Sequence, residues 1–409
     1  MDVFKGNFTQ QEPLPQQALE AAAHVLGHGR LHRYNVVAGE TAEAALLEQE
    51  FAQLTGSRYC LALASGGAAM RVALRAIGVG RGDFVLSNGF TLPPVPGAIT
   101  AVGAKTIFVE VTKNLTIDFD DLALKIVQSD AKTLLLSHMR GHICDMDRLM
   151  SLCNTHGVRV IEDCAHTMGA HWNGLPSGRH GVMSCYSTQT YKHINSGEGG
   201  LLISDDDEAM ARAILLSGSY MLYDRHLAAP KSEIFANLKL ETPNMSSRMD
   251  NLRAAILRPQ LSVLPERVAR WRVLYDTLAQ GLSDTPGLAL TKRAAGENFT
   301  GSSFQFLIMD WDSPRLQSLV ARAAKRGVDL KWFGAEEPLG FTSRYDHWKF
   351  TKGAPLPKTD LILQGLFDMR LPLSFSPDDC VLIARILRAE ILSISQSGPD
   401  AEVGLINVD

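Results

Sequence analysis

The stretch CLALASGGAAMRVALRAIG, Cys60 to Gly78, joins a short apolar run to a segment whose apolar residues recur at helical spacing. The spacing predicts a strand that ends at Ser65, a turn at Gly66 and Gly67, and a helix that begins at Ala68 and closes on a glycine. Free N–H groups at such a helix start, with no side chains on the two glycines, can cradle a phosphate. The stretch matches neither the Walker loop nor GxGxxG, so a plain tight turn explains it equally well.

Strand-length apolar runs recur along the first half of the chain, and helical segments separate several of them. One helical segment, Met146 to Gly157, is again closed by a glycine. Continuous apolar strands flanked by helices imply a mostly parallel sheet buried on both faces, with ligands beyond the carboxyl ends of the strands. The sequence therefore predicts the α/β class. The further strand runs are FVLSN (84–88), TIFVEV (106–111), TLLLSH (133–138), VRVIED (158–163), GVMSCYS (181–187) and GGLLIS (199–204).

The length of 409 residues exceeds what one core usually supports, so two lobes are expected. After Met249 a long helical stretch carries Pro259 and Pro265, which should kink or divide it where it links the lobes. We expect a large domain over 1–260 and a small C-terminal α+β domain over 261–409. The small domain should hold a strand in Ser302 to Trp311, a helix near Pro314 to Arg326, a helix around Asp378 to Ser393 and a loose tail, SGPDAEVGLINVD.

Composition narrows the choice of partners. The chain has 40 basic and 44 acidic residues and no run of like charges that would grip a phosphate backbone, so nucleic acid is not an expected partner. No apolar run reaches the roughly 18 residues that span a bilayer, and no signal-like segment opens the chain, so a cytoplasmic location without membrane contact is expected. Six scattered cysteines without CxxC spacing predict reduced thiols and no metal site.

Two side chains near strand ends could carry chemistry. Asp163 ends the run VRVIED, where α/β proteins place functional groups, although a capping or turn aspartate is the commoner interpretation of one such residue. Lys192 follows the strand-like CYSTQ and precedes SGEGG, whose glycines let backbone approach a ligand. A desolvated lysine has a lowered pKa and can bind an aldehyde covalently, whereas most lysines lie on solvated loops.

The glycine turn, the strand-end carboxylate and the sheltered lysine together meet the requirements of one cofactor, pyridoxal 5'-phosphate (PLP). The turn would hold its phosphate, and Asp163 would keep its pyridine nitrogen protonated so that the ring can act as an electron sink. Lys192 would bind its aldehyde. The combination, rather than any one residue, favours a PLP enzyme.

The assembled residues closely resemble the sugar aminotransferases of the DegT/DnrJ/EryC1/StrS family, which are PLP enzymes of fold type I. The resemblance runs from about Gly29 to Leu261 with strong motifs and continues weakly to the C-terminus. It implies a homodimer with active sites at the subunit interface. The matching stretches are ASGGAAMRVALRAIGVGRGD, GAKTIFVEV, MRGHICDMDRLMSLCNTHGVRVIEDCAHTMGA, CYSTQTYKHINSGEGGLLIS and TPNMSSRMDNLRAAILRPQL.

The resemblance implies a role for each matched residue. Lys192 would bind the cofactor covalently, Asp163 would pair with the pyridine nitrogen, and His166, by itself more often a packed core histidine, would contact the oxygen-bearing face of the ring. The implied phosphate and ring contacts are Gly66, Gly67, Ala68, Leu92, Ser187, Gln189 and, from the neighbouring subunit, Asn244, with Arg248 near that interface.

Two positions depart from the family pattern. Gly67 stands where the family commonly has threonine, so backbone N–H groups must replace one phosphate-binding hydroxyl. Leu92 stands where many members stack an aromatic ring on the cofactor, so either Leu92 or Phe90 would cover it.

The implied activity is that of a transaminase of the EC 2.6.1 type in amino sugar biosynthesis. L-Glutamate or L-glutamine would give up the amino group, Lys192 would move the Cα proton, and a keto-sugar would accept the nitrogen. The acceptor is open between a nucleotide-linked sugar, a keto-sugar acid and a cyclitol. Two alternatives are a sugar dehydratase of the same fold, which has histidine at the lysine position, and a non-catalytic PLP-binding regulator.

Acceptor recognition has two candidate segments. In GRLHRYN (29–35), Arg33 and Tyr34 could meet an acidic or phosphorylated acceptor, although an exposed loop explains them equally well. The stretch Ser217 to Phe235 is longer than a minimal connection and unlike the common family sequence, so recognition of the acceptor could be specialised there.

Overall fold

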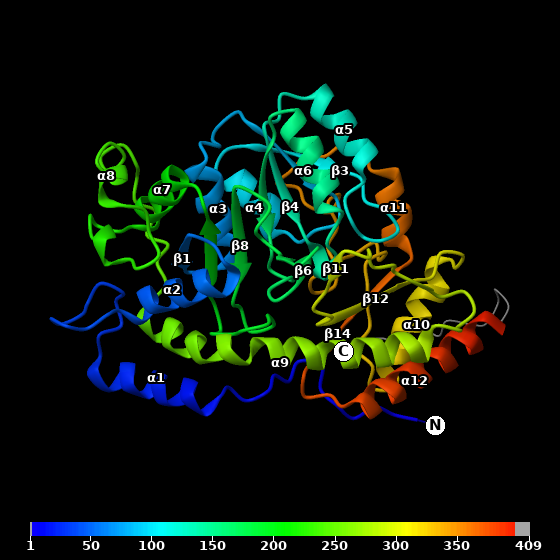
Figure 1. Cartoon of the computed structure of the whole chain (residues 1–409). Coiled ribbons are helices and arrows are strands. Elements are labelled where there is room, and N and C mark those ends of the chain that lie inside the picture. Colours follow the sequence, from blue (N-terminus) through cyan, green and yellow to red (C-terminus); the bar gives the residue numbers. More distant parts are fainter. Residues whose placement is uncertain (1, 397–409) are drawn as a thin grey trace.

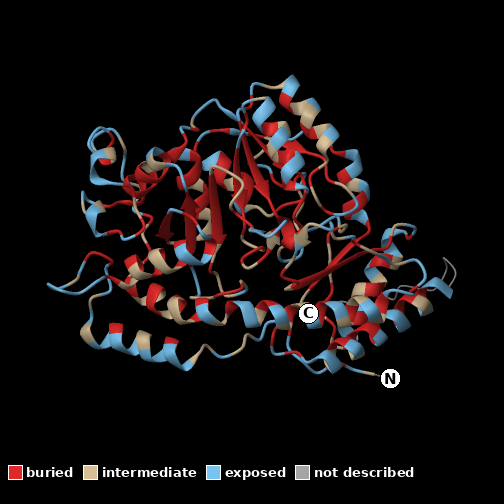
Figure 2. Ribbon diagram, in the orientation of Figure 1, coloured by how far each residue is buried: buried red, intermediate tan, exposed pale blue. Residues whose placement is uncertain are grey.

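The structure, a computed structural model, describes residues 2–396, so the predicted C-terminal tail lies outside the described residues. Its centre is a seven-stranded sheet in the order β1-β9-β8-β5-β4-β2-β3, and the strands are the buried, red arrows of Figure 2. Within this sheet only β9 runs against the others. The arrangement confirms the predicted α/β class with a mostly parallel sheet. The strands are β1 Tyr59–Leu63, β2 Phe84–Asn88, β3 Lys105–Val109, β4 Thr133–Ser137, β5 Arg159–Asp163, β8 Met183–Ser187 and β9 Gly200–Ser204.

The reversed direction of β9 follows from the chain that leads into it. Residues 188–199 join the end of β8 to the start of β9 and hold no helix. The connection is at the lower limit of length for a parallel crossover and lacks the helix that usually forms one, and the two strands pair antiparallel. Lys192 lies in this connection, at the carboxyl end of β8.

Helices cover both faces of the sheet (Figure 1). Side chains alternate along the strands: Leu61 and Leu63 of β1 face the core beneath α3, α4 and α7, whereas Cys60 and Ala62 face α2 and α9. Helices α5 and α6 pack beyond β4 and β5 on the second face. The elements of this part are α1 Gln16–His28, α2 Glu43–Thr55, α3 Gly66–Ala76, α4 Pro94–Ala101, α5 Phe119–Gln128, η1 Met139–Gly141, α6 Met146–Thr155, α7 Asp207–Ser217, η2 Tyr223–Arg225 and α8 Ser232–Phe235.

A second core lies around a four-stranded antiparallel sheet in the order β10-β12-β14-β13. Helices α10 and α12 pack on it, and Phe4 and Phe8 from the start of the chain join the same core. In a small third sheet, β11, which follows α9 in the chain, pairs with β6, which precedes α9. This sheet joins segments from both sides of the predicted domain boundary at 260/261, so that boundary stays a prediction. The elements are β10 Ala289–Leu290, β12 Ser303–Leu307, α10 Ser313–Lys325, β13 Lys331–Trp332, α11 Pro357–Gln364, β14 Leu366–Arg370, α12 Pro377–Gln396, β6 His171–Trp172, β7 Leu175–Pro176 and β11 Glu297–Asn298.

The long helix α9, Asn251–Leu282, crosses beneath both cores in Figure 1. The expectation that its prolines divide it is wrong, because Pro259 and Pro265 lie inside one uninterrupted helix. Apolar side chains bury it along its whole length, the first half in the core under α2 and the second half in the core around β12. This packing outweighs the main-chain hydrogen bonds that the two prolines cannot donate.

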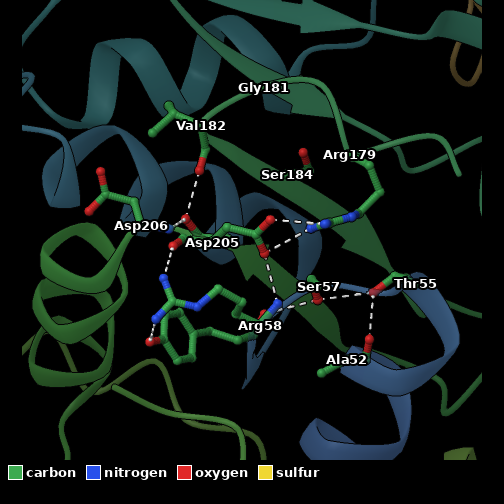
Figure 3. Close-up of polar contacts among 12 residues, drawn as sticks. Ala52, Thr55, Ser57, Arg58, Arg179, Gly181, Val182, Ser184, Asp205 and Asp206 are labelled. Atoms are coloured by element: carbon green, nitrogen blue, oxygen red, sulfur yellow. Dashed lines mark hydrogen bonds and ion pairs between the residues drawn. The ribbon is translucent and has the colours of Figure 1, made fainter. Parts of the chain in front are cut away.

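Polar contacts hold the edge of the large sheet at the end where β1 begins and β9 stops (Figure 3). The Asp205 carboxylate accepts the backbone N–H of Arg58 at 2.7 Å and both terminal nitrogens of Arg179 at 2.9 Å.

The six cysteines are free and buried. Among residues 2–396 no helix is long and apolar enough to cross a membrane.

A buried ion pair fixes the segment that precedes α2. The Arg33 guanidinium donates to both oxygens of Glu48 at 2.8 and 2.9 Å, and both side chains are almost fully buried. Glu48 also accepts from the backbone N–H of Ala62 in β1 and contacts His226, whose other ring nitrogen lies 2.8 Å from the Tyr34 hydroxyl. Arg33 and Tyr34 are therefore neither an exposed loop nor free to meet an acceptor.

Glu48→Gln is expected to lower the free energy of unfolding by about 3–5 kcal/mol, because it leaves the Arg33 charge buried without compensation. Arg33 and His226 outweigh the effect of burial and lower the pKa of Glu48 to about 2, from an ordinary 4.5. The stabilisation is therefore complete above about pH 4.5 and disappears as the pH falls through about 2, so wild type and variant should converge in acid. Urea unfolding at several pH values measures both effects.

The matched control is Glu50→Gln, whose carboxylate pairs with Arg258 at a half-exposed position. It should cost less than about 1 kcal/mol. Equal losses for the two variants would show that the Arg33–Glu48 pair is not a special feature of the core.

Candidate active site

Three neighbouring strands end in polar side chains at one edge of the large sheet. Ser137 ends β4, Asp163 ends β5 and Ser187 ends β8, and these strands lie side by side in the order β8-β5-β4. Ser137 and Asp163 are direct partners in the β4–β5 register, and the Ser137 hydroxyl donates to Asp163 Oδ2 at 3.1 Å. The carboxyl ends of parallel strands thus gather these groups where α/β proteins place ligands.

A cavity of about 340 Å³ opens at this edge, within the size range of small-molecule sites. Glycines from the start of α3, the connection after β8 and the ends of β4 and β5 all contribute to its wall. Most of the predicted site residues line it, namely Gly66, Gly67, Leu92, Asp163, His166, Ser187, Gln189 and Lys192.

Lys192 and His166 meet at the cavity wall, with Nζ and Nε2 2.9 Å apart. Burial, opposed by Asp163, lowers the pKa of Lys192 from 10.5 to about 8. Burial and the neighbouring lysine hold the pKa of His166 well below its usual value. A neutral imidazole therefore faces the amine. Near neutral pH the neutral, nucleophilic form is a larger fraction of Lys192 than of an ordinary lysine.

Asp163 is a buried carboxylate with few local donors. Its Oδ1 accepts from the backbone N–H of Ala165 at 3.1 Å, and its Oδ2 accepts from Ser137. Burial raises the pKa of Asp163, against the opposing effects of the Ala165 N–H, Lys192 and the Ser137 hydroxyl. Among residues 2–396 no cation forms an ion pair with this carboxylate, and a protonated nitrogen in the cavity would supply one, so the site fits a pyridinium ring.

The start of α3 leaves two N–H groups free for an anion. The side chain of Ser65 caps the helix by accepting from the backbone N–H of Ala68 at 3.0 Å, so the N–H groups of Gly66 and Gly67 remain available. A Cβ at Gly66 would lie 2.9 Å from Cβ of Ser187, so this close approach needs glycine. A Cβ at Gly67 would meet nothing nearer than 3.9 Å, so packing alone does not explain the glycine there.

Some predicted residues lie elsewhere. Ala68 is buried and is not part of the cavity wall. Asn244 Oδ1 accepts the backbone N–H of Ser246 at 2.9 Å, and its contact with a partner subunit, like the homodimer itself, stays a prediction. Leu92 lines the cavity, whereas Phe90 is buried against Phe333 with ring centroids 5.1 Å apart.

Sequence reasoning missed several residues at or near the cavity. Ser137 could have been found, because it ends a predicted strand in the same way as Asp163. Tyr191 and Arg370 line a second cleft that also contains Lys192. Arg140, which follows the cavity residue Met139, had no local signal that set it apart from surface arginines.

Comparison with known proteins gives consistent matches over most of the chain. The model of the DegT/DnrJ/EryC1/StrS aminotransferase family matches residues 18–388. The chain is 30% identical over 356 residues to a dTDP-3-amino-3,4,6-trideoxy-alpha-D-glucose transaminase of Micromonospora megalomicea subsp. nigra, covering 86% of this chain and 88% of the relative. It is 28% identical over 290 residues to an L-glutamine:scyllo-inosose aminotransferase of Streptomyces griseus, covering 70% of this chain and 67% of the relative.

The fold matches solved structures as well. The crystal structure of the aminotransferase TlmJ from Streptoalloteichus hindustanus superposes with a TM-score of 0.79 at 23% identity, covering 97% of this chain and 100% of that one. At this level of identity the match speaks for the fold.

Proposed function

The chain belongs to the DegT/DnrJ/EryC1/StrS aminotransferase family, and from this premise we propose that it moves an amino group from L-glutamate or L-glutamine to a carbonyl of a keto-sugar. The acceptor classes are a nucleotide-linked sugar, a keto-sugar acid and a cyclitol. The two relatives, one a dTDP-sugar transaminase and one an L-glutamine:scyllo-inosose aminotransferase, support a sugar or cyclitol as the acceptor. The second relative also supports L-glutamine as a donor.

The family depends on PLP, which, when bound, carries the amino group and withdraws electrons from the carbon that exchanges its proton. In this chain Lys192 would hold the aldehyde end, and Asp163 would face the ring nitrogen. Gly66, Gly67 and Ser187 would hold the phosphate, and Leu92 would cover the ring. The size of the cavity, the free N–H groups of α3 and the buried carboxylate support this assignment.

The protein's own groups can move the protons that amino transfer requires. Lys192 Nζ, in its neutral form, would be the base that takes the proton from Cα of the amino donor, and in its protonated form the acid that gives it back. Asp163 would hold the ring nitrogen of the cofactor, and its carboxylate would favour a proton on that nitrogen, which would keep the ring electron-poor. His166, whose Nε2 lies 2.9 Å from Nζ, would orient the amine between these two tasks.

The observation that carries the proposal is the presence of the Lys192 amine in the same cavity as Asp163 and Gly66. It also argues against the dehydratase alternative, which needs a histidine at the lysine position. His193 is not part of this cavity wall; its Nε2 lies 3.1 Å from the Ser302 hydroxyl, and its ring packs edge-on against Trp271. A histidine is adjacent in sequence but does not take the place of the lysine.

The proposal is tested with the holoenzyme and a donor labelled with heavy nitrogen in its amino group. L-Glutamate or L-glutamine should abolish the long-wavelength absorbance of the bound cofactor and release the keto acid. Scyllo-inosose or a dTDP-linked keto-sugar should then restore the absorbance and appear in the mass spectrum with the labelled nitrogen. A deoxygenated sugar without nitrogen would establish the dehydratase, and a donor-insensitive spectrum would favour the regulator.

A further inference from the structure

Arg370 is a cation without a counter-ion beside the proposed reaction site. It ends β14 and lines the cleft that it shares with Tyr191 and Lys192. Its guanidinium stacks on the Tyr191 ring, 3.6 Å from the centroid, and lies 5.5 Å from that of Phe341. Within residues 2–396 its guanidinium makes no ion pair and no side-chain hydrogen bond. Aromatic stacking orients this group but supplies no negative charge.

The pairing of the neighbouring strands explains why Arg370 has no carboxylate partner among the described residues. In the β12–β14 register Asp368 lies opposite Gln305, and Arg370 lies opposite Ser303. Residues two apart on a strand share a face, so Asp368 and Arg370 point to the same side. Asp368 is already engaged, because it pairs with Arg140 Nη2 at 2.9 Å and accepts from Gln305 Nε2 at 2.6 Å.

Arg140 brings a second guanidinium to the same place from the large sheet. It follows the cavity residue Met139, has a left-handed backbone with φ of 55°, and is buried with its Nε unpartnered. Its guanidinium lies 4.2 Å from the Phe341 centroid, so one ring contacts both arginines. A left-handed conformation at a residue with a bulky side chain is uncommon and is found disproportionately at functional sites.

The charges around Lys192 therefore do not balance. Asp368 compensates Arg140 and Asp163 faces Lys192, but no carboxylate in the described part of the chain pairs with Arg370. Both arginines act on the catalytic groups, since each contributes to lowering the pKa of Lys192 and of His166. An anion that enters the cleft would pair with Arg370 and relieve this repulsion.

We propose that Arg370, with Arg140 behind it, forms a subsite that binds a carboxylate of the substrate within reach of Lys192. The inference rests on the proposed transaminase function of the same cavity. A planar guanidinium fixed by stacking matches the two oxygens of a carboxylate. The carboxylate can come from the amino donor or from an acidic acceptor such as a keto-sugar acid, because donor and acceptor occupy the cavity in turn.

The subsite is tested first by binding alone, with glutarate as an unreactive dicarboxylate. Calorimetric titration of the PLP-loaded Arg370→Gln protein should give a Kd about 10- to 100-fold weaker than wild type, as expected for the loss of a charge-assisted pair. Arg370→Lys, which keeps the charge but loses the planar fork, should fall between the two. Arg212→Gln, which removes a surface arginine paired with Glu208 on α7, should bind as wild type does.

The two sources of the carboxylate are separated by following each half-reaction in a spectrophotometer. If Arg370→Gln slows only the reaction with L-glutamate, the subsite binds the carboxylate of the donor. If the variant also slows the reaction of the aminated enzyme with 5-keto-D-gluconate, but not with the neutral scyllo-inosose, the subsite binds an acidic acceptor as well. Unchanged glutarate affinity in an Arg370→Gln protein that retains PLP and its melting temperature would overturn the proposal. Failure of the wild type to transfer nitrogen would instead disprove the transaminase assignment, because glutarate binding needs no turnover.

Discussion

Lys192→Ala protein is expected to have a kcat for amino transfer at least about 10³-fold below that of wild type. The substitution removes the only amine that lines the candidate cavity among the described residues. The proton on Cα of the donor then loses its base, and the neighbouring His166 is a poor substitute, because burial lowers its pKa even without the lysine. Steady-state assays with L-glutamate and L-glutamine measure the loss.

A second measurement on the same protein identifies the covalent site. Borohydride reduction followed by peptide mass spectrometry should find the cofactor attached to Lys192 in wild type and absent in the variant. Lys105→Ala removes an exposed lysine at the start of β3 and should change neither result. Attachment of the cofactor at another lysine in Lys192→Ala, with kcat preserved, would contradict the assignment.

Asp163→Asn is expected to lower kcat by about 10²- to 10⁴-fold, while leaving the fold intact. Asparagine has nearly the same shape but cannot hold a proton on the ring nitrogen by charge. The amide has a single oxygen, so it can accept the hydrogen bond from Ala165 or the one from Ser137. Turnover and the absorbance of the bound cofactor report the effect.

The control exploits an aspartate whose role asparagine can fill. Asp145 caps α6 by accepting the backbone N–H of Arg148, and asparagine is an equally good cap, so Asp145→Asn should keep wild-type kcat. If Asp163→Asn bound PLP and turned over within a few-fold of wild type, the carboxylate would not be the electrostatic partner of the ring.

Glu162, next to Asp163, shows how one strand end gives two carboxylates different tasks. Its side chain points to the opposite side of the sheet, as expected for successive strand residues, and accepts from the backbone N–H groups of His180 and Gly181 at 2.9 and 2.7 Å. Burial would raise the pKa of Glu162, but the neighbouring His138 and His180 side chains lower it. Glu162 is therefore a structural anion, whereas Asp163 is short of donors and faces the cavity.

Sequence alone predicted the parts of the site that depend on local pattern. Apolar runs located the strands, and the parallel arrangement then placed Asp163 at the carboxyl edge, whereas Ser187 was predicted from the family resemblance. Lys192 and the glycines of α3 followed from motifs that are continuous in the chain. Each of these inferences needs only residues within a few positions of one another.

The remainder depends on contacts between distant segments. Both interpretations of Arg33, an acceptor contact and an exposed loop, were wrong, because nothing nearby in the sequence reveals that Glu48 and His226 enclose it. The unpaired state of Arg370 follows from Arg140 taking Asp368, a contact between the large sheet and the small one. The continuity of α9 likewise depends on packing against two cores, which overrides the local effect of its prolines.

The continuity of α9 limits how far the two cores can move relative to each other. Helix α9 packs into both cores, so neither core can rotate against the other unless the helix bends. Pro259 and Pro265 lie inside the helix and cannot donate main-chain hydrogen bonds. A large rotation of one core against the other would therefore have to bend α9, and the segment around the two prolines is where that bending costs least.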